Sequence, residues 1–161
     1  MEGEYRTLFE RTGYGSTMWS PLAGGFLTGK YLDGIPEETN RLTDKDKFPA
    51  DLYKKIFYDP FSNENCVKGL KEVKKIAEEE LNCKLNHLAL AWAMKFKYTS
   101  TIIVGSRNVE QLEDNLKAFE VMEKLTPELE GKINKLLGNG PDNRMYFTVG
   151  KPDVPVRPIA Q

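Results

Sequence analysis

Apolar residues recur three and four positions apart in several parts of the chain, which is the spacing of one helical face. This pattern predicts helices over residues 5–12, 50–57, 62–81, 86–94, 108–119 and 126–137. The last helix is well marked, because Thr126 can cap its start, Pro127 suits its first turn and Gly138 can end it. Asn86 is the expected cap of the fourth helix, which is apolar nearly all round and is expected to be buried on more than one side.

Two short runs, residues 16–19 and 101–104, have the character of strands. The second run is continuously apolar, which is typical of a strand covered on both faces in a parallel sheet. Strands that alternate with helices predict an α/β fold built from βα units. Two parallel strands need neighbours on both edges, so we expect a larger fold. We expect the isolated chain to fold poorly, self-associate, or need a partner chain with the missing strands.

Two segments carry no regular pattern. Residues 32–63 combine prolines, charges and aromatic side chains, with only the one short helix near 50–57. A loop of this length in a compact domain is usually functional or flexible, so it could shape a substrate pocket or contact a partner. The chain from Gly140 onward holds four prolines, and residues 141–161 are expected to form a tail that lies over the surface or is disordered.

Composition narrows the possible partners. The 23 Lys and Arg residues are balanced by 24 Asp and Glu, which argues against nucleic acid because phosphate binding needs a basic face. No apolar run approaches the roughly 18 residues of a membrane helix, and the start of the chain has no signal-peptide core. Cys66 and Cys83 have no spacing typical of a metal site or a disulfide framework. We therefore expect no metal, no membrane insertion and a cytoplasmic location.

The segment MWSPLAGGFLTGKY, residues 18–31, follows directly on the first predicted strand. In parallel α/β folds the ligand lies at the carboxyl ends of the strands. Glycines let backbone N–H groups approach phosphate oxygens closely, and Lys30 could add a positive charge. Trp19, the last strand residue, could offer a flat ring at the mouth of such a site.

The second predicted strand is followed by Gly105, Ser106 and Arg107, which lead into a helix start. Asn108 and Gln111 there have the spacing of a capping box. A helix N-terminus favours anions, and a guanidinium suits phosphate. Together the two loops fit a phosphate-bearing ligand with a flat ring, such as a dinucleotide, although the GxGxxG fingerprint of a Rossmann site is absent.

Each feature also has a plainer interpretation when it is taken singly. The glycine-rich loop could be only a turn, Trp19 a packed core aromatic, and Arg107 a solvated surface charge. His87, the single histidine, stands beside a helix start and is interpreted as structural.

Three motifs in order resemble the aldo-keto reductase family, most closely the branch of the shaker-type potassium channel β-subunits. WSPLAGGFLTGKY, with GIP at residues 34–36, resembles the loop after the seventh strand of that family. IIVGSRNVEQLEDN, residues 102–115, resembles its eighth strand and the following helix, and the terminal LLGNGP is similar to the end of that branch. The resemblance covers residues 2–141, and residues 1–140 are taken as the C-terminal portion of such a protein.

The resemblance implies a partial (β/α)8 TIM barrel that covers strands seven and eight, and binding of NADP(H). Trp19 would stack on the nicotinamide, Lys30 and the loop would hold the pyrophosphate, and Arg107 would carry most of the charge facing the 2′-phosphate. The full set of implied cofactor-binding residues is Trp19, Ser20, Pro21, Leu22, Ala23, Gly24, Lys30, Arg41, Gly105, Ser106, Arg107, Gln111, Asp114 and Asn115.

The family reduces carbonyl groups by hydride transfer, with an Asp, a Tyr, a Lys and a His or Asn from the first half of the barrel. This chain shows no match to these residues, and its 161 residues are fewer than the roughly 250 of a whole barrel. We therefore expect the cofactor-binding part of a reductase, inactive alone. The alternatives are a non-catalytic regulator similar to a potassium-channel β-subunit, and an interaction module without nucleotide.

Overall fold

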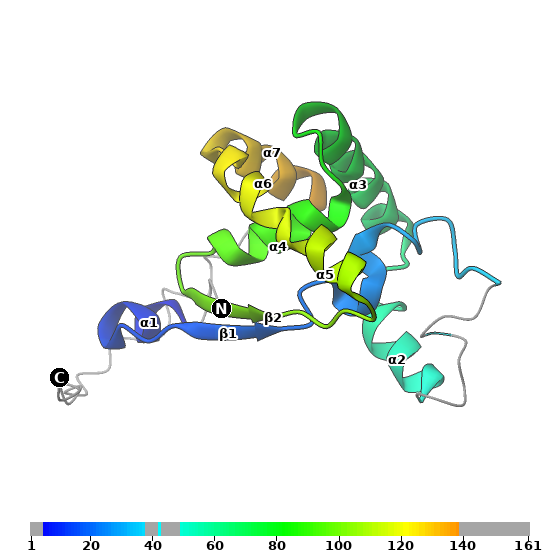
Figure 1. Cartoon of the computed structure of the whole chain (residues 1–161), viewed down its shortest axis with the longest axis horizontal. Coiled ribbons are helices and arrows are strands. Elements are labelled where there is room, and N and C mark those ends of the chain that lie inside the picture. Colours follow the sequence, from blue (N-terminus) through cyan, green and yellow to red (C-terminus); the bar gives the residue numbers. More distant parts are fainter. Residues whose placement is uncertain (1–4, 38–41, 43–48, 139–161) are drawn as a thin grey trace.

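The computed structural model describes residues 5–37, 42 and 49–138, and its elements are labelled in Figure 1. A parallel pair of strands, β1 (Ser16–Trp19) and β2 (Thr99–Ile103), lies below a layer of helices (Figure 1). The strands pair with Met18 opposite Ile102 and Trp19 opposite Ile103, so both carboxyl ends lie together. The α/β class and the parallel pairing agree with the sequence analysis.

The helices follow the predicted segments closely. They are α1 (Arg6–Thr12), α2 (Ala50–Phe57), α3 (Glu64–Lys75), α4 (Leu85–Lys95), α5 (Val109–Leu116), α6 (Ala118–Lys124) and α7 (Pro127–Leu137). A 3₁₀ segment, η1 (Ala23–Thr28), lies in the loop after β1, and a π-helical turn, η2 (Ile76–Glu80), extends α3. The predicted tail after Gly140 lies outside the described residues.

Local capping explains where several helices begin and end. The side chains of Asn63, Asn108 and Thr126 accept hydrogen bonds from backbone N–H groups in the first turns of α3, α5 and α7. Gly13 and Gly138 take left-handed conformations directly after α1 and α7, which is the usual way that a glycine ends a helix. The predicted caps at Thr126 and Asn108 and the predicted stops at Gly13 and Gly138 are confirmed.

The core lies between the helices and the loop after β1. Its buried side chains come from η1, α3, η2, α4, α6 and α7 and from the segments that connect them, with Phe26, Leu88 and Leu125 among the largest that are fully enclosed. Helix α3 packs so closely on α7 that a Cβ on Gly69 would stand 2.9 Å from the Leu136 carbonyl oxygen. Helix α4 is buried on several sides, as predicted, and covers the sheet.

Among the described elements the helices pack on one face of the second strand, and Ile103 on the other face is 59% exposed, which agrees with strands that lack the neighbours of a larger fold. Two other expectations about these elements are wrong. Asn86 does not cap α4; the residue at the cap is Lys84, and Asn86 lies buried in the first turn. The helix predicted over 108–119 divides at Lys117, where α5 ends and α6 begins with the buried Ala118.

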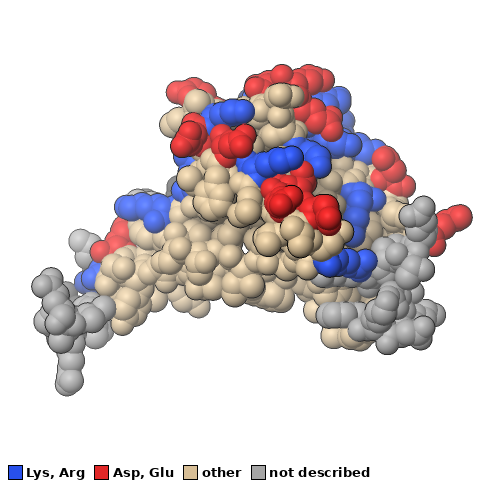
Figure 2. Space-filling view, viewed as in Figure 1, with Lys and Arg blue, Asp and Glu red and all other residues tan. Residues whose placement is uncertain are grey.

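The uncovered face of the sheet continues as a surface with few charges. Trp19 and Ile103 form an exposed cross-strand pair. In Figure 2, Lys, Arg, Asp and Glu gather over the helical layer, whereas the edge of the molecule along β1 and β2 shows almost none. Within the described ranges each strand has one neighbour, so one edge of each remains open. None of the described helices is long and apolar enough to cross a membrane.

Candidate functional site

The loop after β1 is shaped by a run of unusual backbone conformations. Ser20 and Ala23 have φ of 52° and 46°, and Gly24 and Gly25 follow with 63° and 102°. Positive φ is uncommon for residues with a side chain and is found preferentially at ligand sites, where the surroundings stabilise it. The loop therefore turns sharply at the end of the strand and returns through η1 onto the helical core.

Helix α2 supports this loop from one side. A Cβ on Gly24 would stand 2.8 Å from Phe57 Cβ and 2.9 Å from Tyr53 Cε1, so a glycine is required by both the close approach and the positive φ. The Phe57 ring also meets Trp19 edge-on, with 6.0 Å between ring centroids. Trp19 nevertheless remains 71% exposed, so it is not a core aromatic. Much of its side chain is therefore accessible from solvent.

The loop after β2 is held by side chains of α5. The Arg107 backbone N–H donates to Gln111 Oε1 at 2.9 Å, and the Gln111 N–H donates to the Asn108 side chain at 2.9 Å. Asn115 Nδ2 donates to Ser106 Oγ at 3.4 Å. The predicted capping box is therefore only partly formed. The Asn108 side chain caps the helix, but the Gln111 side chain accepts from the backbone N–H of Arg107 and not from that of Asn108. The loop is fixed while the Arg107 side chain stays exposed.

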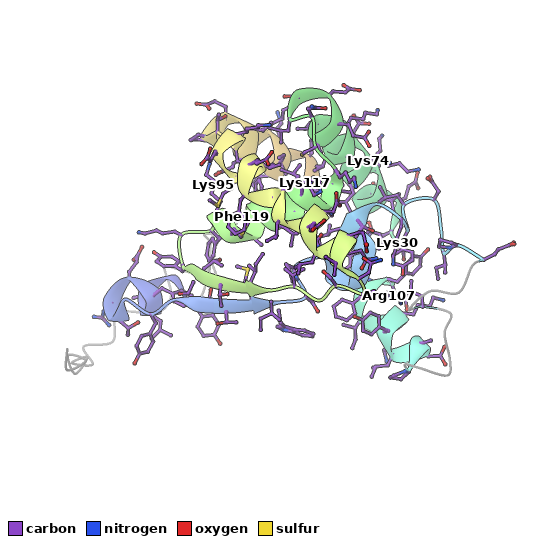
Figure 3. All side chains as sticks on the ribbon, in the orientation of Figure 1. Lys30, Lys74, Lys95, Arg107, Lys117 and Phe119 are labelled. Atoms are coloured by element: carbon purple, nitrogen blue, oxygen red, sulfur yellow. The ribbon has the colours of Figure 1, made fainter. Side chains whose placement is uncertain are left out.

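The two loops enclose one groove of about 610 Å³ at the carboxyl ends of the strands. Trp19 lies in its wall on the β1 side and Arg107 on the β2 side, and Figure 3 shows Arg107 near Lys30. The predicted site residues that line it are Trp19, Ser20, Pro21, Leu22, Gly24, Lys30, Gly105, Arg107, Gln111, Asp114 and Asn115. Ala23 and Ser106 belong to the same loops but do not line the groove, and Arg41 lies outside the described residues.

Several further residues that were not predicted from the sequence line the same groove. Lys84 and Asn86 enter it from the start of α4, and Tyr53 enters it from α2. Neither helix follows a strand directly, so the expectation that ligands bind at the carboxyl ends of strands did not predict these residues. The sequence did single out Asn86, because a polar residue at the start of an otherwise apolar helix needs a hydrogen-bond partner. The partner was expected to be the backbone of the helix itself, as in a cap.

Asp114 is the centre of the charged contacts at one end of the groove. Its Oδ1 accepts a hydrogen bond from Lys84 Nζ at 2.8 Å, and Lys117 Nζ lies 3.7 Å away. Its Oδ2 lies 3.1 Å from His87 Nε2 and accepts from Asn86 Nδ2 at 3.3 Å. The bond from Lys84, with smaller effects of His87 and Asn86, holds the pKa of the Asp114 carboxyl well below its usual range.

This depressed pKa predicts a pH dependence of stability. The folded pKa lies below the unfolded value of about 3.9, so the stabilisation is complete at neutral pH and is lost as the pH falls below about 4. We expect Asp114→Asn to lower the free energy of unfolding at pH 7 and to differ less from the wild type at pH 3. Urea unfolding at both pH values measures this. Glu113→Gln, which removes a neighbouring exposed carboxylate on α5, is the control.

The control should leave the free energy of unfolding nearly unchanged at both pH values, since an isolated surface charge contributes little. A constant difference between Asp114→Asn and the wild type from pH 7 to pH 3 would contradict the assigned contacts.

The chemistry of the groove suits an anionic ligand with a flat ring. Lys30, Lys84 and Arg107 line it, and Asp114 is its only carboxylate among the described residues and is already paired. A volume of about 610 Å³ lies within the range of small-molecule and cofactor sites, about 300–1,000 Å³. No cluster of metal-ligating side chains occurs in the part of the chain that the structure describes.

Fold and groove together define an α/β protein with a groove across the carboxyl ends of two parallel strands. The sequence model described as "Aldo/keto reductase family" matches residues 2–137, and the chain belongs to this family. The chain is also similar to the "Putative voltage-gated potassium channel subunit beta" of Schizosaccharomyces pombe (strain 972 / ATCC 24843), at 40% identity over 134 residues. That match covers 83% of this chain and 37% of the length of the relative.

Proposed function

We propose that this chain carries the NADP(H)-binding part of an aldo-keto reductase. The observation that supports this most strongly is that Trp19 and Arg107, 88 residues apart in the sequence, line one groove. Trp19 provides an exposed aromatic face for the nicotinamide ring, and Arg107 provides a guanidinium for the 2′-phosphate. A single ligand with a ring at one end and a phosphate at the other could contact both Trp19 and Arg107.

The other lining residues have roles that follow from their places along the groove. The loop from Ser20 to Gly24, with Lys30, holds the pyrophosphate, where cationic and backbone donors are needed. Gln111 lies beside Arg107 near the 2′-phosphate, and Asp114 and Asn115 meet the adenosine. When bound, the reduced cofactor supplies a hydride for a carbonyl substrate. The residues of this chain bind and orient that cofactor.

We further propose that β1 and β2 are strands seven and eight of a (β/α)8 barrel. The open strand edges and the exposed pair of Trp19 and Ile103 support this arrangement, since both require cover from further strands. In that arrangement the residues that protonate the substrate come from strands outside these 161 residues, and the chain alone binds cofactor without reducing carbonyls. A partner chain, or self-association, would cover the sheet.

A second candidate function is regulatory. The similarity to a protein named as a potassium channel β-subunit favours a nucleotide sensor that associates with a channel subunit. Both candidates use the same groove, so nucleotide binding does not separate them. Carbonyl reduction by this chain together with the missing barrel strands would favour the reductase, whereas nucleotide binding without turnover would favour the regulator.

Nucleotide binding can be followed by tryptophan fluorescence. Trp19 is exposed in the groove wall, whereas Trp92 packs against the hydrophobic core, so the two rings report different environments. In the Trp92→Phe variant we expect NADPH to quench the remaining Trp19 emission saturably. In the matched Trp19→Phe variant we expect little saturable quenching. A folded Trp92→Phe protein with no saturable quenching would favour the interaction module without nucleotide.

A further inference from the structure

His87, at the start of α4, is buried, and each of its ring nitrogens lies near a polar group of another residue. The side chain is 5% exposed and is the single histidine of the chain. Its Nδ1 accepts from the Lys84 backbone N–H at 3.4 Å. A neutral imidazole that accepts at Nδ1 carries its proton on Nε2. That Nε2 lies 3.1 Å from Asp114 Oδ2, so the two groups are in contact, but their alignment does not make a hydrogen bond, and Nε2 is a buried nitrogen without a hydrogen-bond partner among the described residues.

Asp114 connects His87 to the groove through a series of side chains. Asn86 Nδ2 donates to Asp114 Oδ2 at 3.3 Å and also to Asn115 Oδ1 at 3.2 Å. Asn115 Nδ2 in turn donates to Ser106 Oγ at 3.4 Å. These contacts form a polar network from the buried imidazole to the loop that bears Arg107. It joins the start of α4 to both ends of α5.

His87 itself does not line the groove. It borders a separate hollow of about 370 Å³ on the other side of Asp114, together with Lys117 and Lys124. Asp114 borders both spaces. His87 can therefore act on a ligand in the groove only through the carboxylate that it contacts.

We propose that His87 is a positioning residue that holds Asp114, and through Asn86 and Asn115 the adenosine end of the groove, in a conformation ready for the cofactor. This rests on the proposed function. Lys84 and Lys117 lie at one carboxylate oxygen, Oδ1, and His87 and Asn86 contact the other, Oδ2. Without the imidazole, the attraction of the two lysines at Oδ1 is no longer balanced by a contact of His87 with Oδ2. The carboxylate then turns away from Asn86, and Asn115 loses its fixed partner.

The binding test compares His87→Leu with His87→Gln in the full chain. Leucine removes the donor at constant burial, whereas glutamine can accept from the Lys84 N–H and donate to Asp114. We expect His87→Leu to weaken 2′,5′-ADP and NADPH by about fivefold to tenfold, and His87→Gln to restore most of that loss. Reduced nicotinamide mononucleotide, which lacks the adenosine half, should bind each variant equally. Equal losses for both probes, or no loss, would overturn the proposal.

A double-mutant cycle tests whether His87 acts through Asp114. In an Asp114→Asn background, His87→Leu should cause less than about a twofold further loss of 2′,5′-ADP affinity, because the carboxylate contact is already gone. An undiminished further loss would show that His87 acts by another route and would overturn the proposal.

A spectroscopic test needs no ligand. The single histidine gives one imidazole signal set, and long-range ¹H–¹⁵N spectra identify the protonated nitrogen. We expect the Nε2–H form at neutral pH, with a shift of the Asn115 side-chain amide in His87→Leu and not in His87→Gln. The Nδ1–H form, or an unmoved Asn115 amide, would overturn the proposal. If the wild type shows these signals but binds neither nucleotide, the proposed function fails and the contact network stands.

Discussion

Arg107→Ala is expected to weaken NADPH binding by about tenfold to a hundredfold, while NADH binding changes by less than about twofold. The two nucleotides differ only in the 2′-phosphate, which is the group assigned to this guanidinium. A charge-assisted pair between arginine and phosphate is among the stronger hydrogen-bonded contacts in proteins. Arg107 lines the groove, and its backbone is fixed by Gln111, so the substitution removes charge from a loop that stays in place. Fluorescence titration of the Trp92→Phe protein measures both affinities.

Lys74→Ala is the matched control for this loss. It removes one positive charge from α3, outside the lining of the groove, where Lys74 pairs with Glu78 at 3.8 Å. Figure 3 labels both cations and shows them on different elements. The control should leave both affinities unchanged. Equal losses of NADPH and NADH in Arg107→Ala would remove the 2′-phosphate role, and a loss in Lys74→Ala would point to long-range charge alone.

Phe26→Ala is expected to lower the free energy of unfolding by about 3–5 kcal/mol. The Phe26 side chain is fully enclosed and its ring lies 5.6 Å from that of Phe61 and 6.0 Å from that of Tyr58, measured between centroids. The loss is a large fraction of the roughly 5–15 kcal/mol that stabilises a domain. Because Phe26 anchors η1 on the core, the loop from Ser20 to Gly25 should also lose its fixed position, and NADPH affinity should fall. Urea unfolding and NADPH titration, at a temperature where the variant is folded, measure the two effects.

Leu125→Ala separates stability from the position of the loop. Leu125 is also fully buried, but it lies between α6 and α7 and outside the groove lining. Its truncation should cost about 2–5 kcal/mol and leave NADPH affinity unchanged in the folded protein. If Phe26→Ala and Leu125→Ala reduce the affinity equally, the loss comes from general destabilisation and the anchoring role of Phe26 is wrong.

Much of the candidate site was predictable because its two loops follow strands. The carboxyl ends of parallel strands meet at one edge of a sheet, so motifs that follow two such strands come together without any further information. For this reason Trp19 and Arg107 were predicted to share a site, and the structure brings them to one groove. That either residue binds a nucleotide stays a prediction. The contribution of Arg41 also stays a prediction, since it lies outside the described residues.

The sequence by itself determined the elements whose signals are local. Thr126 and Asn108 cap their helices, and Gly13 and Gly138 end theirs, because a cap needs only backbone groups a few residues away. Tertiary structure alone decided the rest. The described helices pack on one face of the sheet, so Ile103 on the other face is exposed. The Asn86 side chain donates to Asp114 and Asn115 and does not cap α4. His87 reaches Asp114 only because α4 packs beside α5. Burial and side-chain pairing depend on contacts between segments far apart in the chain, and no local pattern specifies them.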